Sequence, residues 1–208
     1  FFMTSYELSS NKILRWREER LKEGGIASEV DFLLDQAGGL SWSELQKLHM
    51  SVKSKYSLHQ SLEELEIIWH KYLFQNIPLQ YLIGHCSWRD FELEVTSSVL
   101  IPRQETELLI DLGLKKIGDQ HKGLWVDLGT GSGALAIALA RAIPDWEGHA
   151  VDCSRDALLL AEKNLKKIAP DKDVIFHLGN WWQPLKPIWG LIDLVLANPP
   201  YIPNYLIN

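Results

Sequence analysis

The sequence predicts an α/β protein with a parallel sheet, preceded by a small all-helical domain. Three observations support this fold class. From Pro102 onward, segments with helical spacing alternate with short apolar segments that are typical of strands. One of these strands runs into the glycine-rich turn 129–133, and another ends in Asn198-Pro199-Pro200-Tyr201. Before residue 78, the apolar residues recur at helical spacing.

The composition limits the classes of protein to be considered. The chain has 208 residues, of which 46% are hydrophobic and 23% charged, and its formal net charge is -6. These are globular values. Because residues 1–77 and 78–208 are each net acidic, we expect no direct nucleic-acid partner. The low cysteine count and the lack of a long apolar run favour a cytoplasmic protein with no membrane partner.

Residues 1–77 are expected to form a helical bundle that recognises a substrate. Glycine pairs end the first two helices and serines begin the last three: Gly24-Gly25, Gly38-Gly39, Ser28, Ser41 and Ser61. Ser41 and Ser61 are each followed by a glutamate, Glu44 and Glu64, at the spacing of a capping box.

Residues 78–101 are expected to form a β-hairpin linker. Phe91, Leu93 and Val95 alternate with two glutamates, which is strand spacing. We predict a hairpin over 80–95 with Gly84 near its turn. Residues 102–208 then alternate helices (105–117, 133–142, 156–168) with strands (124–128, 148–151, 174–178, 191–197), and such alternation produces a parallel sheet.

The glycine-rich turn predicts a nucleoside cofactor. Gly129, Thr130, Gly131, Ser132 and Gly133 link a strand to a helix, so that backbone N–H groups and the helix N-terminus can face a ligand. Asp152, at the end of the next strand, could accept hydrogen bonds from both ribose hydroxyls.

The choice of nucleoside depends on Asp127. Gly129, Gly131 and Ala134 fit the dinucleotide fingerprint, so a nicotinamide cofactor is one alternative. A carboxylate at Asp127 would repel a pyrophosphate but could hold the ammonium of a methionyl group, unless it only caps the turn. A Walker loop and a nucleophile elbow are both missing. The histidines lack metal-ligand spacing, so no metal is expected.

The segment Asn198-Pro199-Pro200-Tyr201 predicts a site for a planar NH2 group. Both prolines remove an N–H donor, which leaves the carbonyls of Asn198 and Pro199 and the Asn198 side-chain oxygen as acceptors. Tyr201 would supply a ring face. The alternative is a proline-rich strand exit without a role.

Together these motifs resemble class I S-adenosylmethionine (SAM)-dependent methyltransferases that act on planar nitrogen. Residues 78–84 (Pro-Leu-Gln-Tyr-Leu-Ile-Gly) and 100–107 (Leu-Ile-Pro-Arg-Gln-Glu-Thr-Glu) resemble, more narrowly, the PrmC/HemK family of release factor glutamine methyltransferases. With the helical domain, the resemblance covers essentially the whole chain. It implies a Rossmann-like sheet of seven strands, of which we place four before Asn208, so the last three are expected to be missing.

The resemblance also implies the chemistry. SAM would be the cofactor and S-adenosylhomocysteine the product, and the substrate would be the amide nitrogen of a glutamine in the Gly-Gly-Gln motif of a peptide chain release factor. Alternatives are methylation of an amino group in nucleic acid (adenine N6 or guanine N2) and a non-catalytic partner-binding protein with a SAM fold.

The implied roles fall on residues already singled out. Residues 129–133 would line the methionyl group, Asp152 would bind the ribose, and Asn180 with Trp181 would contact the adenine. Asn198 to Tyr201 would hold the substrate glutamine. Thr106 and Glu107 would either close the pocket wall or cap a helix.

Overall fold

The computed structural model describes residues 5–50 and 53–199, and it divides into two units, Phe1–Ile83 and Gly84–Asn208. The division falls six residues after the predicted end of the helical domain at residue 77, because the expected linker is shared between the units. Its first part is the short helix α5 (Leu79–Ile83) rather than a strand.

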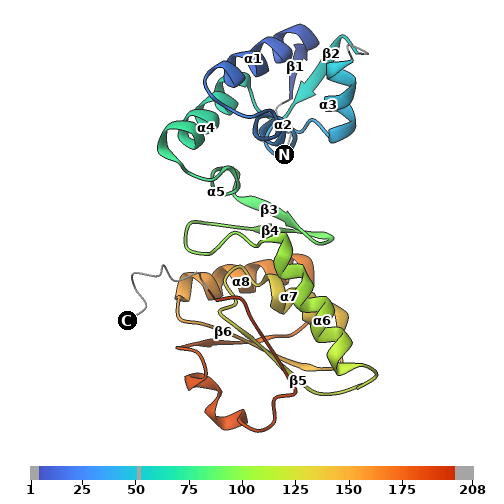
Figure 1. Ribbon diagram of the computed structural model, residues 1–208, viewed down its shortest axis with the longest axis vertical. Helices are drawn as coiled ribbons and strands as arrows, with labels where there is room; N and C mark the ends of the chain where they lie inside the picture. The colour runs from blue at the N-terminus through green and yellow to red at the C-terminus, as the bar shows by residue number, and fades with distance from the viewer. Residues whose placement is uncertain (1–4, 51–52, 200–208) are drawn as a thin grey trace. The chain divides into compact units, whose positions relative to one another are not determined.

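The first unit contains the four predicted helices and, in addition, a two-stranded ribbon (Figure 1). Its elements are β1 (Tyr6–Ser9), α1 (Ser10–Lys22), α2 (Ala27–Gln36), α3 (Trp42–His49), β2 (Lys55–Leu58), α4 (Leu62–Gln75) and α5. The prediction of an all-helical domain is therefore wrong, since β1 and β2 pair antiparallel. Each strand has four residues with only two apolar positions, Tyr6 and Leu8 in β1 and Tyr56 and Leu58 in β2. Two apolar residues are too few to establish period-two alternation.

The capping residues account for most of the helix starts. Ser41 and Ser61 form the predicted capping boxes, in which each serine side chain accepts a hydrogen bond from the glutamate N–H three residues later. Ser28 does not begin a helix. It lies inside α2, whose N-cap is Ile26 and has no side-chain cap.

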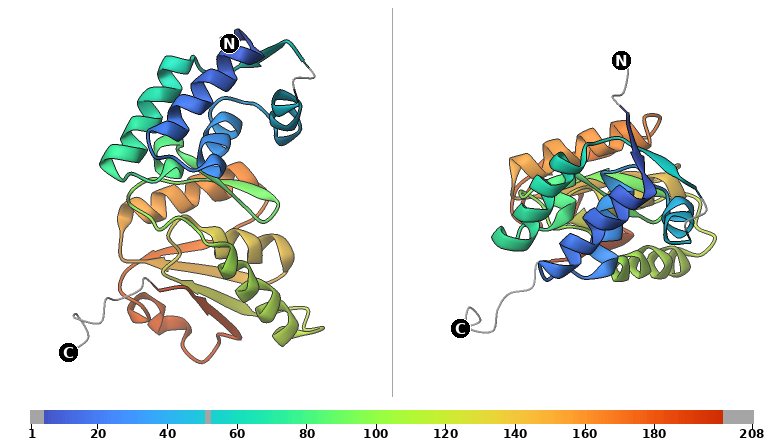
Figure 2. Two further views of the ribbon diagram at one scale, coloured as in Figure 1. Left: turned by 45° about the horizontal axis from the view of Figure 1, so that its top comes forward. Right: turned by 90° about the horizontal axis from the view of Figure 1, so that it is seen from above.

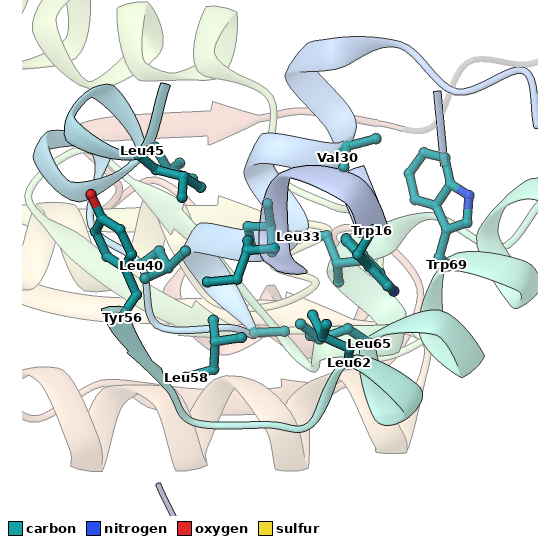
Figure 3. Packing of buried hydrophobic residues seen from close by; sticks show 14 of the residues in the cluster. Trp16, Val30, Leu33, Leu40, Leu45, Tyr56, Leu58, Leu62, Leu65 and Trp69 are labelled. Carbon is teal, nitrogen blue, oxygen red and sulfur yellow. The ribbon is translucent and has the colours of Figure 1, made fainter. Parts of the chain in front are cut away.

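The apolar faces of these helices converge on one core, seen in Figure 3. Leu33, Leu65 and Trp69 are fully buried within it. Gly25 passes so close to the core that a Cβ there would lie 2.2 Å from the Trp69 ring, and this explains the glycine at the end of the first helical segment.

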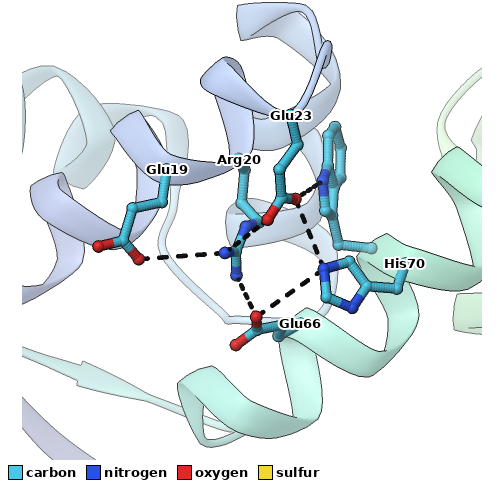
Figure 4. Close-up of polar contacts among 6 residues, drawn as sticks. Glu19, Arg20, Glu23, Glu66 and His70 are labelled. Atoms are coloured by element: carbon cyan, nitrogen blue, oxygen red, sulfur yellow. Dashed lines mark hydrogen bonds and ion pairs between the residues drawn. The ribbon is translucent and has the colours of Figure 1, made fainter.

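A buried arginine joins α1 to α4 (Figure 4). Arg20 is 5% exposed, and its guanidinium lies 2.9 Å from both Glu23 and Glu66. Glu23, Glu66 and His70 have ligand atoms within 4.8 Å of one another, a spacing at which a cation could bind. Because the guanidinium already pairs with both carboxylates, we interpret this cluster as an ion-pair network within the unit.

The second unit is built on the predicted parallel sheet. After the hairpin β3 (His85–Trp88) and β4 (Phe91–Glu94), the chain forms η1 (Gln104–Thr106), α6 (Glu107–Ile117), β5 (Leu124–Leu128), α7 (Ala134–Ala142), β6 (Glu147–Asp152), α8 (Arg155–Ile168), β7 (Ile175–Leu178), η2 (Gln183–Ile188) and β8 (Leu194–Ala197). In this part of the chain the strand order is β7-β6-β5-β8, with every pairing parallel. The α/β prediction is confirmed.

The hairpin lies later in the sequence than predicted. Its turn is at Arg89 and Asp90, whereas Gly84 precedes the first strand. The Asn164 side chain on α8 fixes β4, because Oδ1 accepts from Glu94 N and Nδ2 donates to Glu94 O, at 2.9 and 3.0 Å. The hairpin is thus part of the second unit and not a free linker.

The two faces of the sheet are covered differently, as Figure 2 shows. Leu185 of η2 packs on one face, against Leu124 and Val126. On the other face Gly113 of α6 lies over Leu194 and Leu196. Because Leu196 pairs in register with Asp127, strand alternation directs Asp127 toward the side of α6. No helix in the described part of the chain has the length and apolar character needed to cross a membrane.

Candidate cofactor and substrate site

The glycine-rich turn leaves open space above its backbone. Gly129 and Gly131 have φ values of +76° and +55°, and a Cβ built on Gly129 would meet no atom within 4 Å. The turn is held from below, because Gly129 N and Thr130 N both donate to Val151 O, at 2.8 and 3.0 Å. This rigid, open backbone is a suitable cradle for a ligand.

Gly133 has a different role from the other two glycines. Its φ is +85°, and a Cβ there would lie 3.1 Å from the Cβ of Ala161 on α8. Gly133 is the N-cap of α7 and allows that helix to approach α8. We therefore assign it to helix packing rather than to contact with a ligand, which departs from the role expected from the sequence.

The cradle opens into a pocket of about 320 Å³ at the carboxyl edge of the sheet. The structure brings together here most of the residues predicted to bind a cofactor: Gly129, Gly131, Asp152, Asn180, Trp181 and Asn198. Pro199, predicted to hold the substrate, also lines the pocket. Val99, Leu100 and Ala157 add apolar walls. A mostly apolar cavity with a few polar groups suits a nucleoside.

Asp152 links the glycine turn to the pocket. Its Oδ2 accepts a hydrogen bond from Gly131 N at 2.9 Å, and its Oδ1 accepts from Ser154 N at 2.9 Å. Each carboxylate oxygen can accept more than one hydrogen bond. The half-buried side chain can therefore still accept bonds from two neighbouring hydroxyls.

Asp127 is the most unusual group of the site. It is 1% exposed, and its Oδ2 accepts a hydrogen bond from the Thr130 hydroxyl at 2.7 Å. Burial raises the pKa of Asp127 to about 7, against the opposing effect of the Thr130 bond. Oδ1 is also buried and has no partner with full hydrogen-bond geometry among the described residues, although the backbone N–H of Ala136 lies close enough to the carboxylate to lower its pKa. Asp127 therefore does hold the turn, and its Oδ1 is incompletely paired.

The surroundings of Asp127 Oδ1 indicate whether the site fits a methionyl group. Asp127 lines a small pocket of about 50 Å³ together with Thr130, Ser132 and Asn198, next to the open glycine cradle. A buried carboxylate oxygen that is incompletely paired is unfavourable unless a cation reaches it. The residues present fit a ligand with an ammonium group here and an apolar nucleoside in the larger pocket.

Asn180 and Trp181 form the far wall of the larger pocket. Asn180 O accepts from Gln183 N, which begins the η2 segment. Trp181 has a φ of +48° and remains 49% exposed. A large, half-exposed aromatic ring at a pocket wall provides a surface on which a planar base can stack.

Asn198 lies between the cofactor pocket and a further pocket of about 450 Å³. Its Nδ2 donates to the Thr106 hydroxyl at 3.0 Å, which leaves Oδ1 as the acceptor end of the amide. Thr106 makes no side-chain cap of α6, so the capping alternative is wrong for this residue. Glu107 accepts from Arg89 N. Pro200 and Tyr201 lie outside the described residues.

Comparisons with known proteins identify the family of this chain. The sequence model of the family described as Methyltransferase small domain matches residues 104–204. The release factor glutamine methyltransferase of Prochlorococcus marinus is 59% identical over 198 residues, which cover 94% of this chain and 68% of that protein.

The chain belongs to the release factor glutamine methyltransferase family. A second member, from Synechocystis sp., is 36% identical over 95% of this chain and 68% of its own length. The chain thus spans about two thirds of the length of both relatives. Among solved structures, the human methyltransferase 10 domain containing protein is similar with a TM-score of 0.44 and 21% identity, over 55% of this chain and 56% of that chain.

Membership of this methyltransferase family confirms the resemblance predicted from the motifs and removes the nicotinamide alternative. The sequence reasoning missed the residues that line the further pocket beside Asn198, namely Leu100, Arg103, Glu105 and Leu109. Arg103 and Glu105 belong to the segment 100–107 that carried the family resemblance, and this segment was the signal that could have identified them.

Proposed function

We propose that this protein transfers a methyl group from SAM to the side-chain amide nitrogen of a glutamine in a peptide chain release factor. The observation that carries the proposal is the position of Asn198, whose side chain lines both the pocket above the glycine turn and the adjoining pocket beside Arg103. An acceptor at this boundary can hold an NH2 group next to a methyl donor. The names of both relatives support the choice of substrate.

The cofactor would be held by groups from three strand ends. Asp127 Oδ1 would accept from the methionyl ammonium beside Gly129 and Gly131, and Asp152 would accept from the ribose hydroxyls. Trp181 would stack on the adenine, with Asn180 beside it. When bound, SAM supplies a methyl group on a positively charged sulfur, which makes that methyl strongly electrophilic.

The protein groups would then act on the substrate amide. An amide nitrogen is a poor nucleophile, because its lone pair is delocalised into the carbonyl. Asn198 Oδ1 and the carbonyls of Asn198 and Pro199 would accept hydrogen bonds from the NH2 group and fix its direction. These acceptors would stabilise the positive charge that grows on nitrogen as the nitrogen–methyl bond forms and the sulfur–methyl bond breaks. The nitrogen would then lose its extra proton to water, so that positioning replaces a strong base.

The first unit would recognise the release factor. Phe32, Tyr72 and Leu73 line a pocket of about 450 Å³ within this unit. Since release factors act on ribosomes during translation, the proposal places the reaction in the cytoplasm.

Methyl transfer from labelled SAM tests the proposed substrate. The full-length protein is incubated with a release factor, with duplex DNA and with ribosomal RNA. Because the chain carries a net charge of -6, we expect label in the release factor and not in either nucleic acid. Label in DNA or RNA without label in the release factor would overturn the proposal in favour of the nucleic-acid alternative.

A further inference from the structure

We infer that Thr106 is a positioning residue for Asn198: its hydroxyl holds the Asn198 amide so that the oxygen, and not the nitrogen, faces the group to be methylated. The inference deepens the proposed function and rests on it. An amide has a donor end and an acceptor end, and only the acceptor end can bind a substrate NH2 group.

The geometry of the pair carries the inference. Asn198 Nδ2 lies 3.0 Å from Thr106 Oγ1, although the two residues are 92 positions apart in the sequence. Thr106 is 8% exposed, so water competes little for its hydroxyl. Thr106 is the last residue of η1, which continues into α6, and its side chain makes no capping hydrogen bond to that helix. The hydroxyl is thus directed to Asn198 instead of the helix.

Sheet alternation explains why these residues meet. Leu196 points toward α6, as Gly113 of that helix shows by lying over it. Asn198 follows two residues later and therefore points the same way. The start of α6 lies above the end of β8, and Thr106 is the residue at that start.

The β3–β4 hairpin holds Thr106 in place. Trp88 Nε1 donates to Arg103 O at 2.9 Å, and Thr106 N donates to the same carbonyl at 3.1 Å. Arg89 at the hairpin turn donates from its backbone N to Glu107 Oε1 and from Nη1 to Glu107 O, both at 3.2 Å. The residues on either side of Thr106 are therefore fixed by one rigid hairpin.

The hydrogen bond matters for the reaction because it fixes the direction of the Asn198 amide. Without the Thr106 hydroxyl, Asn198 Nδ2 loses its partner. The amide can then rotate away from the direction in which its oxygen faces the substrate NH2 group. A misplacement of about 1 Å in a reacting group can lower the rate about 100-fold. Thr106 lines the small pocket beside Asp127, but its hydroxyl is bonded to Asn198. We therefore expect a larger loss in turnover than in cofactor binding.

The test compares Thr106→Val, which keeps the shape and removes the hydroxyl, with Thr106→Ser, which keeps the hydroxyl. In the full-length protein we expect Thr106→Val to lower kcat on a release factor by about 10- to 100-fold, with SAM affinity by calorimetry falling by a smaller factor. Thr106→Ser should restore most of the parent kcat. In an Asn198→Ala background, Thr106→Val should have no further effect.

A second measurement does not depend on activity. In ¹⁵N NMR spectra, the side-chain NH2 signals of Asn198, assigned by their loss in Asn198→Ala, should exchange slowly in the parent and in Thr106→Ser and rapidly in Thr106→Val. A parent kcat in Thr106→Val, or weaker SAM binding with kcat unchanged, would overturn the inference, as would NH2 signals that do not respond. If the parent itself transfers no methyl group to a release factor, the proposed function fails, and the NMR comparison still decides the role of Thr106.

Discussion

Substitution of Asp127 by asparagine should remove the dependence of cofactor binding on pH. Burial raises the pKa of Asp127 to about 7, so the ligand-free protein holds a proton on this side chain below pH 7. An ammonium placed against Oδ1 favours the ionised carboxylate and lowers the pKa in the complex. Binding below pH 7 therefore releases a proton, and affinity must fall as the pH falls.

The size of the pH effect on affinity follows from the fraction of the Asp127 carboxylate that is ionised. With a pKa of about 7, affinity for the methionyl ligand should be roughly tenfold weaker at pH 6 than at pH 7.5, since one pKa unit corresponds to a factor of ten. In Asp127→Asn the charged hydrogen bond is lost. Such a bond contributes about 1.5–3 kcal/mol, so affinity at pH 7.5 should be roughly 10- to 100-fold weaker.

Calorimetry with S-adenosylhomocysteine, which keeps the methionyl group, measures both quantities. Titrations at pH 6 in buffers of different ionisation enthalpy give the number of protons released, which should be near one for the parent and near zero for Asp127→Asn. Titrations of Asp127→Asn also measure any proton release that comes from the ligand amine itself. Equal affinities of the parent at pH 6 and 7.5, without proton release, would refute the assignment of Asp127 to the ammonium.

Three further predictions concern catalysis and stability. Asn198→Ala should lower kcat by about 10²–10³, and Asn198→Asp, which keeps an acceptor, should retain more activity; equal losses in steady-state assays would count against an acceptor role. Gly133→Ala should lower the free energy of unfolding by about 1–3 kcal/mol, because φ is +85° and Ala161 lies 3.1 Å away; an unchanged denaturation midpoint would contradict this. Burial and then the neighbouring His149 lower the pKa of His177, so the unfolded chain binds more protons and stability is lost as pH falls below about 6.5. As the pH is lowered from 7 to 5, the midpoint of thermal unfolding should fall more for the parent than for His177→Gln. A constant difference between the two midpoints would exclude this linkage.

The sequence predicts those parts of the fold that depend on local chemistry. The capping boxes at Ser41 and Ser61 need only residues three positions apart. The glycine turn and Asp152 could be placed because a strand, a turn and a helix follow one another directly. The parallel sheet follows from the same alternation, because each strand is followed by a helix that must cross over.

Features that depend on distant residues could not be predicted in this way. The pairing of Tyr6 with Leu58 joins two strands of four residues that the pattern did not reveal. Thr106 and Asn198 were each singled out, but their hydrogen bond depends on how α6 lies over β8. The state of Asp127 also depends on tertiary structure, since its raised pKa arises from burial and not from its neighbours in the sequence.

The most direct test of the account locates the methyl group on the product. A release factor is treated with SAM and the full-length protein, digested, and its peptides are fragmented in a mass spectrometer. We expect one added methyl group on the side-chain amide nitrogen of a glutamine, and an initial rate of methylation about 10²–10³ lower when the Asn198→Ala variant is used at the same concentration. A methyl group on any other side chain, or equal methylation by the variant, would contradict the claim that Asn198 presents a glutamine amide to the methyl donor.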